Sequence, residues 1–211
     1  RYDTKVEAAT NNNLYTVDIT GGGGGVSVNG ALLICVVRSD TKAYIADGAK
    51  VNQNVSYTSL TQSVYVLANG NSYITAVAGS GGIGASGGIG GVVNVVSFTK
   101  STKAYIGDNA QVAAQKNIVV SAEASQLLIG VAVSVFGAGA TAASGDVGTF
   151  TFENTTEAYI GTGADVISQG NVKVSAADDT LLISVVVAGN GAGAAAVGAA
   201  VSVNTVSSRT R

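Results

Sequence analysis

A repeated motif is the feature that most limits how this 211-residue chain can fold. Three segments align without gaps on the pattern Thr-x-Ala-Tyr-Ile, a short polar stretch, and Ala-x-Val, and they start near residues 41, 102 and 156. The spacing of the motif tyrosines is 105 − 44 = 61 and then 159 − 105 = 54. A unit of this length cannot bury its faces alone, whereas stacked copies form a continuous core. Stacking in register would align Tyr44, Tyr105 and Tyr159, together with Ile45, Ile106 and Ile160, in ladders.

The segments between the motifs favour β-strands. Val, Ile, Thr and Tyr dominate short runs that Gly, Asn and Asp bound. Asp47-Gly48, Asp108-Asn109 and Thr162-Gly163 predict tight turns inside the motifs. The pattern predicts an all-β chain: one parallel β-solenoid domain over residues 1–211, built from three to four imperfect 54–61-residue repeats. The alternative is an antiparallel β-sandwich with the Gly/Ala tracts as hairpin turns.

The repeat length leaves two solenoid geometries open. We favour two turns of about 27 residues per repeat, which would give about eight turns at roughly 4.8 Å each and a rod near 38 Å long. One wide turn per repeat is the alternative. Within residues 126–135 the alternation places large apolar side chains on one face and mostly small ones on the other. We expect both faces to be buried, with a close neighbour on the small side.

Composition excludes several classes of function. The chain has no His and one Cys, which excludes His-dependent catalysis, the usual zinc sites and an internal disulfide framework. Only 11% of residues are charged and the formal net charge is −2, which argues against nucleic acid and favours self-association. No stretch is typical of a membrane helix or a signal peptide. We therefore expect a non-enzymatic protein without metal or cofactor.

Other candidate sites have simple structural explanations. Gly79–Gly84 matches a dinucleotide-binding glycine pattern, but no helix pattern follows it. The buried-strand context of Cys35 predicts an unreactive thiol. The tyrosine column is either a packing ladder or a glycan-binding stripe. The acidic residues Asp108, Asp146, Asp165, Asp178 and Asp179 fit solvated turns better than a calcium site or a glycosidase pair.

The ends of the repeat array predict self-assembly. Neither end shows a Pro or a capping helix, and uncapped solenoid ends present strand edges that can pair with another chain. The expected assembly ends are Arg1, Tyr2, Arg209 and Arg211, and the repeat phase would place the next tyrosine at 204 + 11 = 215. Copies would then join head to tail. Alternatively, the chain is a processed or excerpted piece of a longer exported product whose neighbouring repeats cover these ends.

The motifs at 102–122, 156–176 and 181–206, with a weaker copy at 41–58, resemble the repeats of large secreted bacterial exoproteins. These are the filamentous-haemagglutinin-like adhesins and the leukotoxin-type repeats. The resemblance implies an extracellular β-helical stalk on the cell surface that serves in adhesion, biofilm or matrix. We expect a structural fibre or adhesin subunit whose main partner is itself, with a surface glycan or matrix as a further candidate partner. The alternatives are a glycan-binding stalk, a β-helical carbohydrate-active enzyme and a pore-forming toxin fragment.

Overall fold

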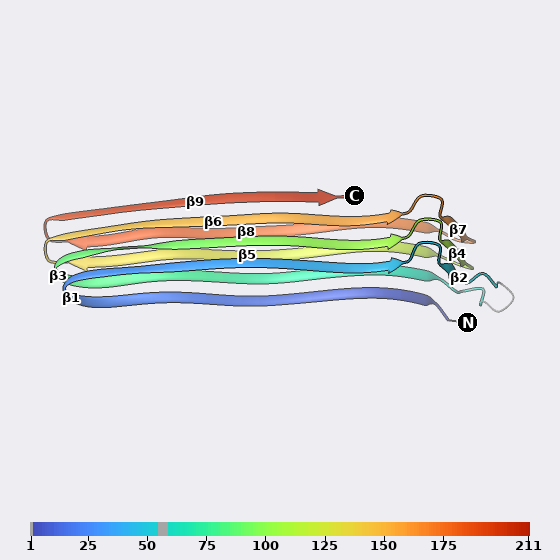
Figure 1. Cartoon of the computed structure of the whole chain (residues 1–211), viewed down its shortest axis with the longest axis horizontal. Helices are drawn as coiled ribbons and strands as arrows, with labels where there is room; N and C mark the ends of the chain where they lie inside the picture. Colours follow the sequence, from blue (N-terminus) through green and yellow to red (C-terminus); the bar gives the residue numbers. More distant parts are fainter. Residues whose placement is uncertain (1, 55–58) are drawn as a thin grey trace.

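The computed structural model describes residues 2–54 and 59–211, which form long strands that run side by side (Figure 1). These residues contain strands β1 (Thr4–Ile45), β2 (Lys50–Val51), β3 (Val64–Ile106), β4 (Gln111–Ala114), β5 (Ile118–Ala138), β6 (Thr141–Ile160), β7 (Asp165–Ser168), β8 (Val172–Ala192) and β9 (Ala195–Thr210). The predicted all-β class is confirmed. Within the described residues, no helix is long and apolar enough to cross a membrane.

Each repeat forms one coil of a parallel β-solenoid. The chain runs out along a first arm, bends, returns along a second arm and crosses a short strand before the next coil begins (Figure 1). We call the bends the tip and the opposite end, with β2, β4 and β7, the base. The first arms are residues 4–24, 64–84, 118–138 and 172–192, and the second arms are 26–45, 87–106, 141–160 and 195–210.

The strand register decides between the predicted geometries. Every pairing among the described strands is parallel, so the antiparallel sandwich is wrong. Val64 pairs with Ile118, which stands one full repeat further along the chain. One coil therefore uses a whole repeat, and the expectation of two turns per repeat is also wrong. The physical reason lies between residues 121 and 127, where Ser-Ala-Glu-Ala-Ser-Gln-Leu contains no Gly or Pro to turn the chain, so the strand continues to the tip.

The unequal repeat spacings come from one connection at the base. From Ile45 to Val64 the numbering advances by 64 − 45 = 19, but from Ile106 to Ile118 it advances only by 118 − 106 = 12. The difference of seven equals the difference between the two spacings of the motif tyrosines. The arms themselves keep register, apart from a shift of one residue between Gly24 and Val26. Length variation therefore lies outside the stacked arms.

The coil geometry makes the molecule wide and shallow. A first arm of 21 residues spans about 70 Å at about 3.3 Å per residue. Four coils at about 4.8 Å spacing rise only about 14 Å from the first to the last. The arms run nearly straight and side by side, so the sheets that they form are nearly flat (Figure 1). The predicted rod of about eight turns is thus replaced by half as many coils, each with about twice as many residues.

The core lies between the two arms. Near the middle of the arms, Phe98, Phe150 and Phe152 pack with Ile74 and Leu128, all of them buried. A second cluster fills the base and includes Ile45 and Ile106. Side chains along each arm alternate between this interior and the outer surface, as the strand period of two requires.

The alternation in β5 has an unexpected orientation. The mostly small set, which includes Gly130, Ala132 and Ser134, faces inward and is buried against the opposite arm. The large set, Leu127, Ile129, Val131, Val133 and Val135, faces outward. The predicted close neighbour on the small side is confirmed, but burial of the large side is not, because no second layer covers the outer face within the described residues. Val135 is 61% exposed.

Glycines on the inner faces make room for large side chains from the opposite arm. A methyl group built on Gly130 would lie 2.0 Å from Cε1 of Phe150. A methyl group on Gly70 would lie 2.7 Å from Cε of Lys100. The small residues of the first arms and the bulky residues of the second arms are therefore complementary, and this fit lets the two sheets approach closely.

Lys100 is a charged residue buried between the arms. Its side chain is 2% exposed, and its Nζ donates to Ser72 Oγ at 3.2 Å. Burial lowers the pKa of Lys100 from its ordinary value of 10.5 to about 8, although the nearby carboxylate of Asp178 acts in the opposite direction. The folded chain therefore carries an energetic cost when this amine is protonated.

We expect Lys100→Met to stabilise the chain at pH 7, and the advantage to shrink as the pH rises from 8 to 10.5. Below pH 8 the lysine is protonated in both states, so its desolvation cost is fully present. Between pH 8 and 10.5 the unfolded state binds the additional proton, so the free energy of unfolding of the wild type rises with pH by up to about 1.4 kcal/mol per unit. Urea titrations at several pH values measure the difference. Lys42→Met, an exposed lysine of the first coil, controls for the loss of a surface charge. An advantage that stays constant with pH would contradict the assignment.

Candidate functional site

The three motif tyrosines form a continuous stack on the outer surface of the second arms near the base. The rings of Tyr44 and Tyr105 lie 5.1 Å apart at 8°, and those of Tyr105 and Tyr159 lie 4.9 Å apart at 3°. Tyr105 is therefore covered on both ring faces. Burial raises the pKa of Tyr105, and the neighbouring Tyr159, Tyr44 and Asp47 act in the same direction. Ile45, Ile106 and Ile160 form the next ladder along the arms, on the inner face of the sheet, and pack in the base core.

The turns that follow the tyrosines are linked from coil to coil by aspartates. Asp47 Oδ1 accepts the backbone N–H of Asp108 at 2.9 Å, and Asp108 Oδ1 accepts that of Thr162 at 2.7 Å. The predicted tight turns are confirmed, with Gly48, Asn109 and Gly163 in the left-handed region at φ of 65°, 53° and 70°. Each carboxylate therefore fixes the turn of the next coil, which ties the stack together at the base.

A column of charged side chains runs beside the tyrosines. Lys103 Nζ lies 2.8 Å from Glu157 Oε2. The hydrogen bond from Lys103 holds the pKa of Glu157 below its usual range, against the opposing effect of burial. Because the pair is partly exposed, its contribution to stability is small.

The first and last coils have open edges. Strand β1 pairs only with β3, β8 only with β5, and β9 only with β6 among the described strands. β1 and β9 lie at opposite sides of the stack (Figure 1). The core is also open there, because Val206 is 51% exposed while its ladder partner Phe152 is 1% exposed. Another coil would pair with the free main-chain N–H and C=O groups and would cover the partly exposed core side chains.

The predicted assembly ends fall at different places on these edges. Tyr2 precedes β1 and is 97% exposed. Arg209 lies in β9, and the main chain of Arg211 continues the ladder, since its N–H donates to Thr156 O at 3.0 Å and its carbonyl accepts from Ala158 N at 2.8 Å. Arg1 lies outside the described residues.

The predicted position of the next tyrosine needs a correction. Asn204 pairs with Phe150, whereas Asn94 pairs with Gly148, so the two asparagines do not occupy equivalent positions. The register that relates Tyr105 to Tyr159, applied once more, places the equivalent position at 159 + 54 = 213 rather than 215.

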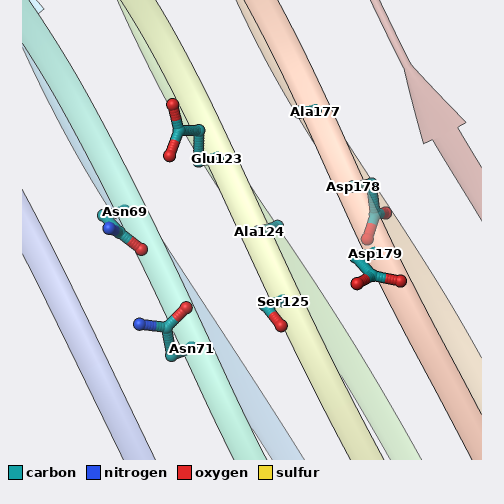
Figure 2. Close-up of a pocket in the computed structure, with 8 residues that line it drawn as sticks. All are labelled: Asn69, Asn71, Glu123, Ala124, Ser125, Ala177, Asp178 and Asp179. Carbon is teal, nitrogen blue, oxygen red and sulfur yellow. The ribbon is translucent and has the colours of Figure 1, made fainter.

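A shallow pocket of about 260 Å³ lies on the outer face of the first arms, toward the base (Figure 2). Glu123 comes from β5, and Asp178 and Asp179 come from β8. Asp178 turns toward the opposite arm, where its Oδ2 accepts from Ser208 Oγ at 2.6 Å, while Asp179 stays exposed. The three carboxylates do not converge on one point (Figure 2), and no group of three metal-ligating side chains occurs in the described part of the chain.

The remaining sequence candidates lie in the solenoid itself. Gly79–Gly84 continues strand β3 to the tip, so no helix N-terminus follows that could hold a pyrophosphate. Cys35 is buried as expected, and burial raises the pKa of its thiol. Asp146 is buried rather than solvated, and its carboxylate accepts the N–H groups of Val92 and Ser134 at 3.0 and 2.9 Å. Asp108 also has a structural role, at the turn described above, which the expectation of a solvated turn did not include.

Sequence reasoning missed the outward apolar surface of the arms. The signal was present in the alternation of β5, where one side is large and the other mostly small, but the orientation of the two sides depends on the opposite arm. Comparison of the chain with protein-family models, with curated protein sequences and with solved structures gives no significant match in any of the three.

Proposed function

We propose that the chain is a structural segment of an extracellular fibre or surface adhesin, and that it extends by stacking end to end on further coils. The observation that carries this proposal is the pair of open ends. The outer edge of β1 at one end of the stack, and the outer edges of β8 and β9 at the other, have no ladder partner among the described strands. Core side chains at both ends of the stack are only partly covered. Such edges template the addition of a strand.

The open edge at one end of the stack can pair with the open edges at the other end of a second copy. A following copy would place its β1 over β8 and β9, with first arm on first arm and second arm on second arm. Its Tyr44 would lie in the same column as Tyr159 but two coil spacings above it, because the coil of β8 and β9 lies between them. Because the contact joins two different surfaces and need not close, repeated addition produces a filament.

The observed geometry gives less support to the alternative functions. A sugar that stacks on aromatic rings needs a free ring face, and both faces of Tyr105 are occupied. A glycosidase needs two carboxylates that flank one bond, whereas Asp178 and Asp179 point to opposite sides of β8. The extracellular placement of the fibre rests on the resemblance of the repeats to secreted adhesins.

Electron microscopy and sedimentation of the purified chain across a concentration series test the proposal. We expect filaments whose axial diffraction shows the strand spacing of about 4.8 Å, with about 19 Å of length added per copy. Dispersed monomers at high concentration would contradict it.

A further inference from the structure

The tip half of the solenoid contains few charged side chains. We define the tip half as residues 13–37, 73–97, 127–151 and 181–205. It contains two charged side chains, Asp18 and Asp146, and both accept main-chain N–H groups from a second arm. All other charged residues lie in the base half. The chain is therefore amphipathic along its arms, over a distance of tens of ångströms.

The outer face of the second arms in the tip half is apolar and includes the exposed Val28, Ile34 and Val201. The outer face of the first arms is apolar to a similar degree. We call it the tip face, and it consists of four parallel rows of outward side chains: Tyr15, Val17 and Ile19; Tyr73, Thr75 and Val77; Leu127, Ile129, Val131, Val133 and Val135; and Leu181, Ile183, Val185 and Val187. Val17 and Ile19 are 66% and 71% exposed. The aromatic pair Tyr15 and Tyr73, 5.5 Å apart, marks its border toward the base.

The size of the tip face depends on the number of stacked coils. Its four rows are about 13, 13, 26 and 20 Å long, which at about 4.8 Å per strand gives about 350 Å² on each copy. Two such faces in contact bury about 700 Å² in total, the size of a weak contact, and a stack of two copies on each side passes the roughly 1,000 Å² of a specific interface. Apolar patches of this size on soluble chains mark interaction sites. Longer stacks would enlarge the contact in proportion to their length.

We propose that the tip face packs against the tip face of a second copy of this chain, sheet on sheet. The rows on both copies have the same strand spacing, so side chains of one copy can settle between those of the other. Gly79, Gly81 and Gly189 leave recesses in the face opposite branched side chains. The flatness of the sheet supports this occupant, since flat sheets are typically stabilised by stacking at about 10 Å. The face carries no charge that such a contact would bury unpaired.

A lipid bilayer is the competing occupant, and the edges of the stack argue against it. Insertion would place the unpaired main chain of β1, β8 and β9 in hydrocarbon, where open sheet edges are not tolerated. A second copy requires no such burial, because face packing leaves the edges in water. The proposal is independent of end-to-end stacking, since it uses side chains of the face and not the strand edges.

The experiment uses the full chain with its upper edge blocked by Val206→Lys, so that end-to-end growth and face packing are separated. In this background we expect a dimer in sedimentation equilibrium. Adding Ile183→Lys and Val185→Lys should weaken the dimer at least 100-fold. The reason is that both lysines of each copy would be buried in the interface against the tip face of the other copy. Ala177→Lys is the matched control, as it adds the same charge to an outward position of β8 in the base half and should leave the dimer intact.

Circular dichroism confirms that each variant retains its β-structure. An edge-blocked chain that stays monomeric at high concentration would overturn the proposal. So would a chain that remains monomeric in buffer but binds neutral phosphatidylcholine vesicles through the tip face. Equal loss of dimer with Ala177→Lys would also overturn it, because the contact would then not be confined to the tip half. These outcomes do not depend on whether filaments form in the unblocked chain.

Discussion

Val206→Lys is expected to leave the chain folded while preventing end-to-end assembly. Val206 lies in β9 in register with Phe152, so its side chain points to the interior of the last coil. It is half exposed at the open end, and a lysine there can reach water. A further coil would cover it, as β9 and its neighbours cover Phe152, and the ammonium group would be buried without a partner. That costs several kcal/mol, so the concentration needed for assembly should rise at least about 100-fold.

The control for this variant is Thr205→Lys. It adds the same charge one residue earlier in β9, where the side chain faces outward and would stay in water after stacking. Sedimentation and electron microscopy at matched concentrations compare the two. Assembly that persists in Val206→Lys as in Thr205→Lys would show that copies do not add at this edge.

Gly130→Ala is expected to destabilise the chain by about 3 kcal/mol or more, a large effect for one methyl group. The new methyl would clash with the fully buried ring of Phe150, so the ring or the main chain of one arm would have to shift. Overpacking of this kind forces side chains off their rotamers or pushes the arms apart. Thermal and urea unfolding measure the loss. For a chain of this size the melting temperature should fall by roughly 6–12 °C.

Gly145→Ala is the matched control, because nothing lies within 4 Å of a methyl group at that position. The effect of Gly130→Ala should also be smaller in a Phe150→Leu background, which provides space for the methyl. A double-mutant cycle measures this coupling. Equal costs for Gly130→Ala and Gly145→Ala, or no coupling to Phe150, would show that the arms do not meet through this contact.

The repeat, the turns and the register of the tyrosines could be predicted from the sequence. Each is encoded locally: Asp47-Gly48 and Thr162-Gly163 favour left-handed turns, and identical flanking residues align the tyrosines whichever coil size is used. The coil size could not be predicted in this way. The Gly/Ala tracts predict bends, but they do not determine how many bends make up one coil. Two narrow turns per repeat and one wide turn per repeat therefore fit the same pattern.

The site at the ends of the stack was partly visible in the sequence, whereas the tip face was not. The lack of Pro and of a helix pattern near the ends of the repeat array predicted open edges, whereas the repeat phase near Asn204 was misassigned by two residues, since Asn204 pairs with Phe150. Which side of β5 faces outward depends on Phe150, from a strand that begins after the next bend.

By itself, the sequence determined that this chain forms β-strands in repeats marked by a tyrosine motif, because β-branched runs, turn residues and repeated motifs act over a few neighbours. Only the tertiary structure decided that the strands pair in parallel, that each repeat makes one wide coil and that the small side chains face inward. The reason is that glycine on one arm and phenylalanine on the other fill a shared volume, and such complementarity belongs to the pair of arms. With the small side turned inward, the large apolar side is left on the surface, where a second copy can cover it.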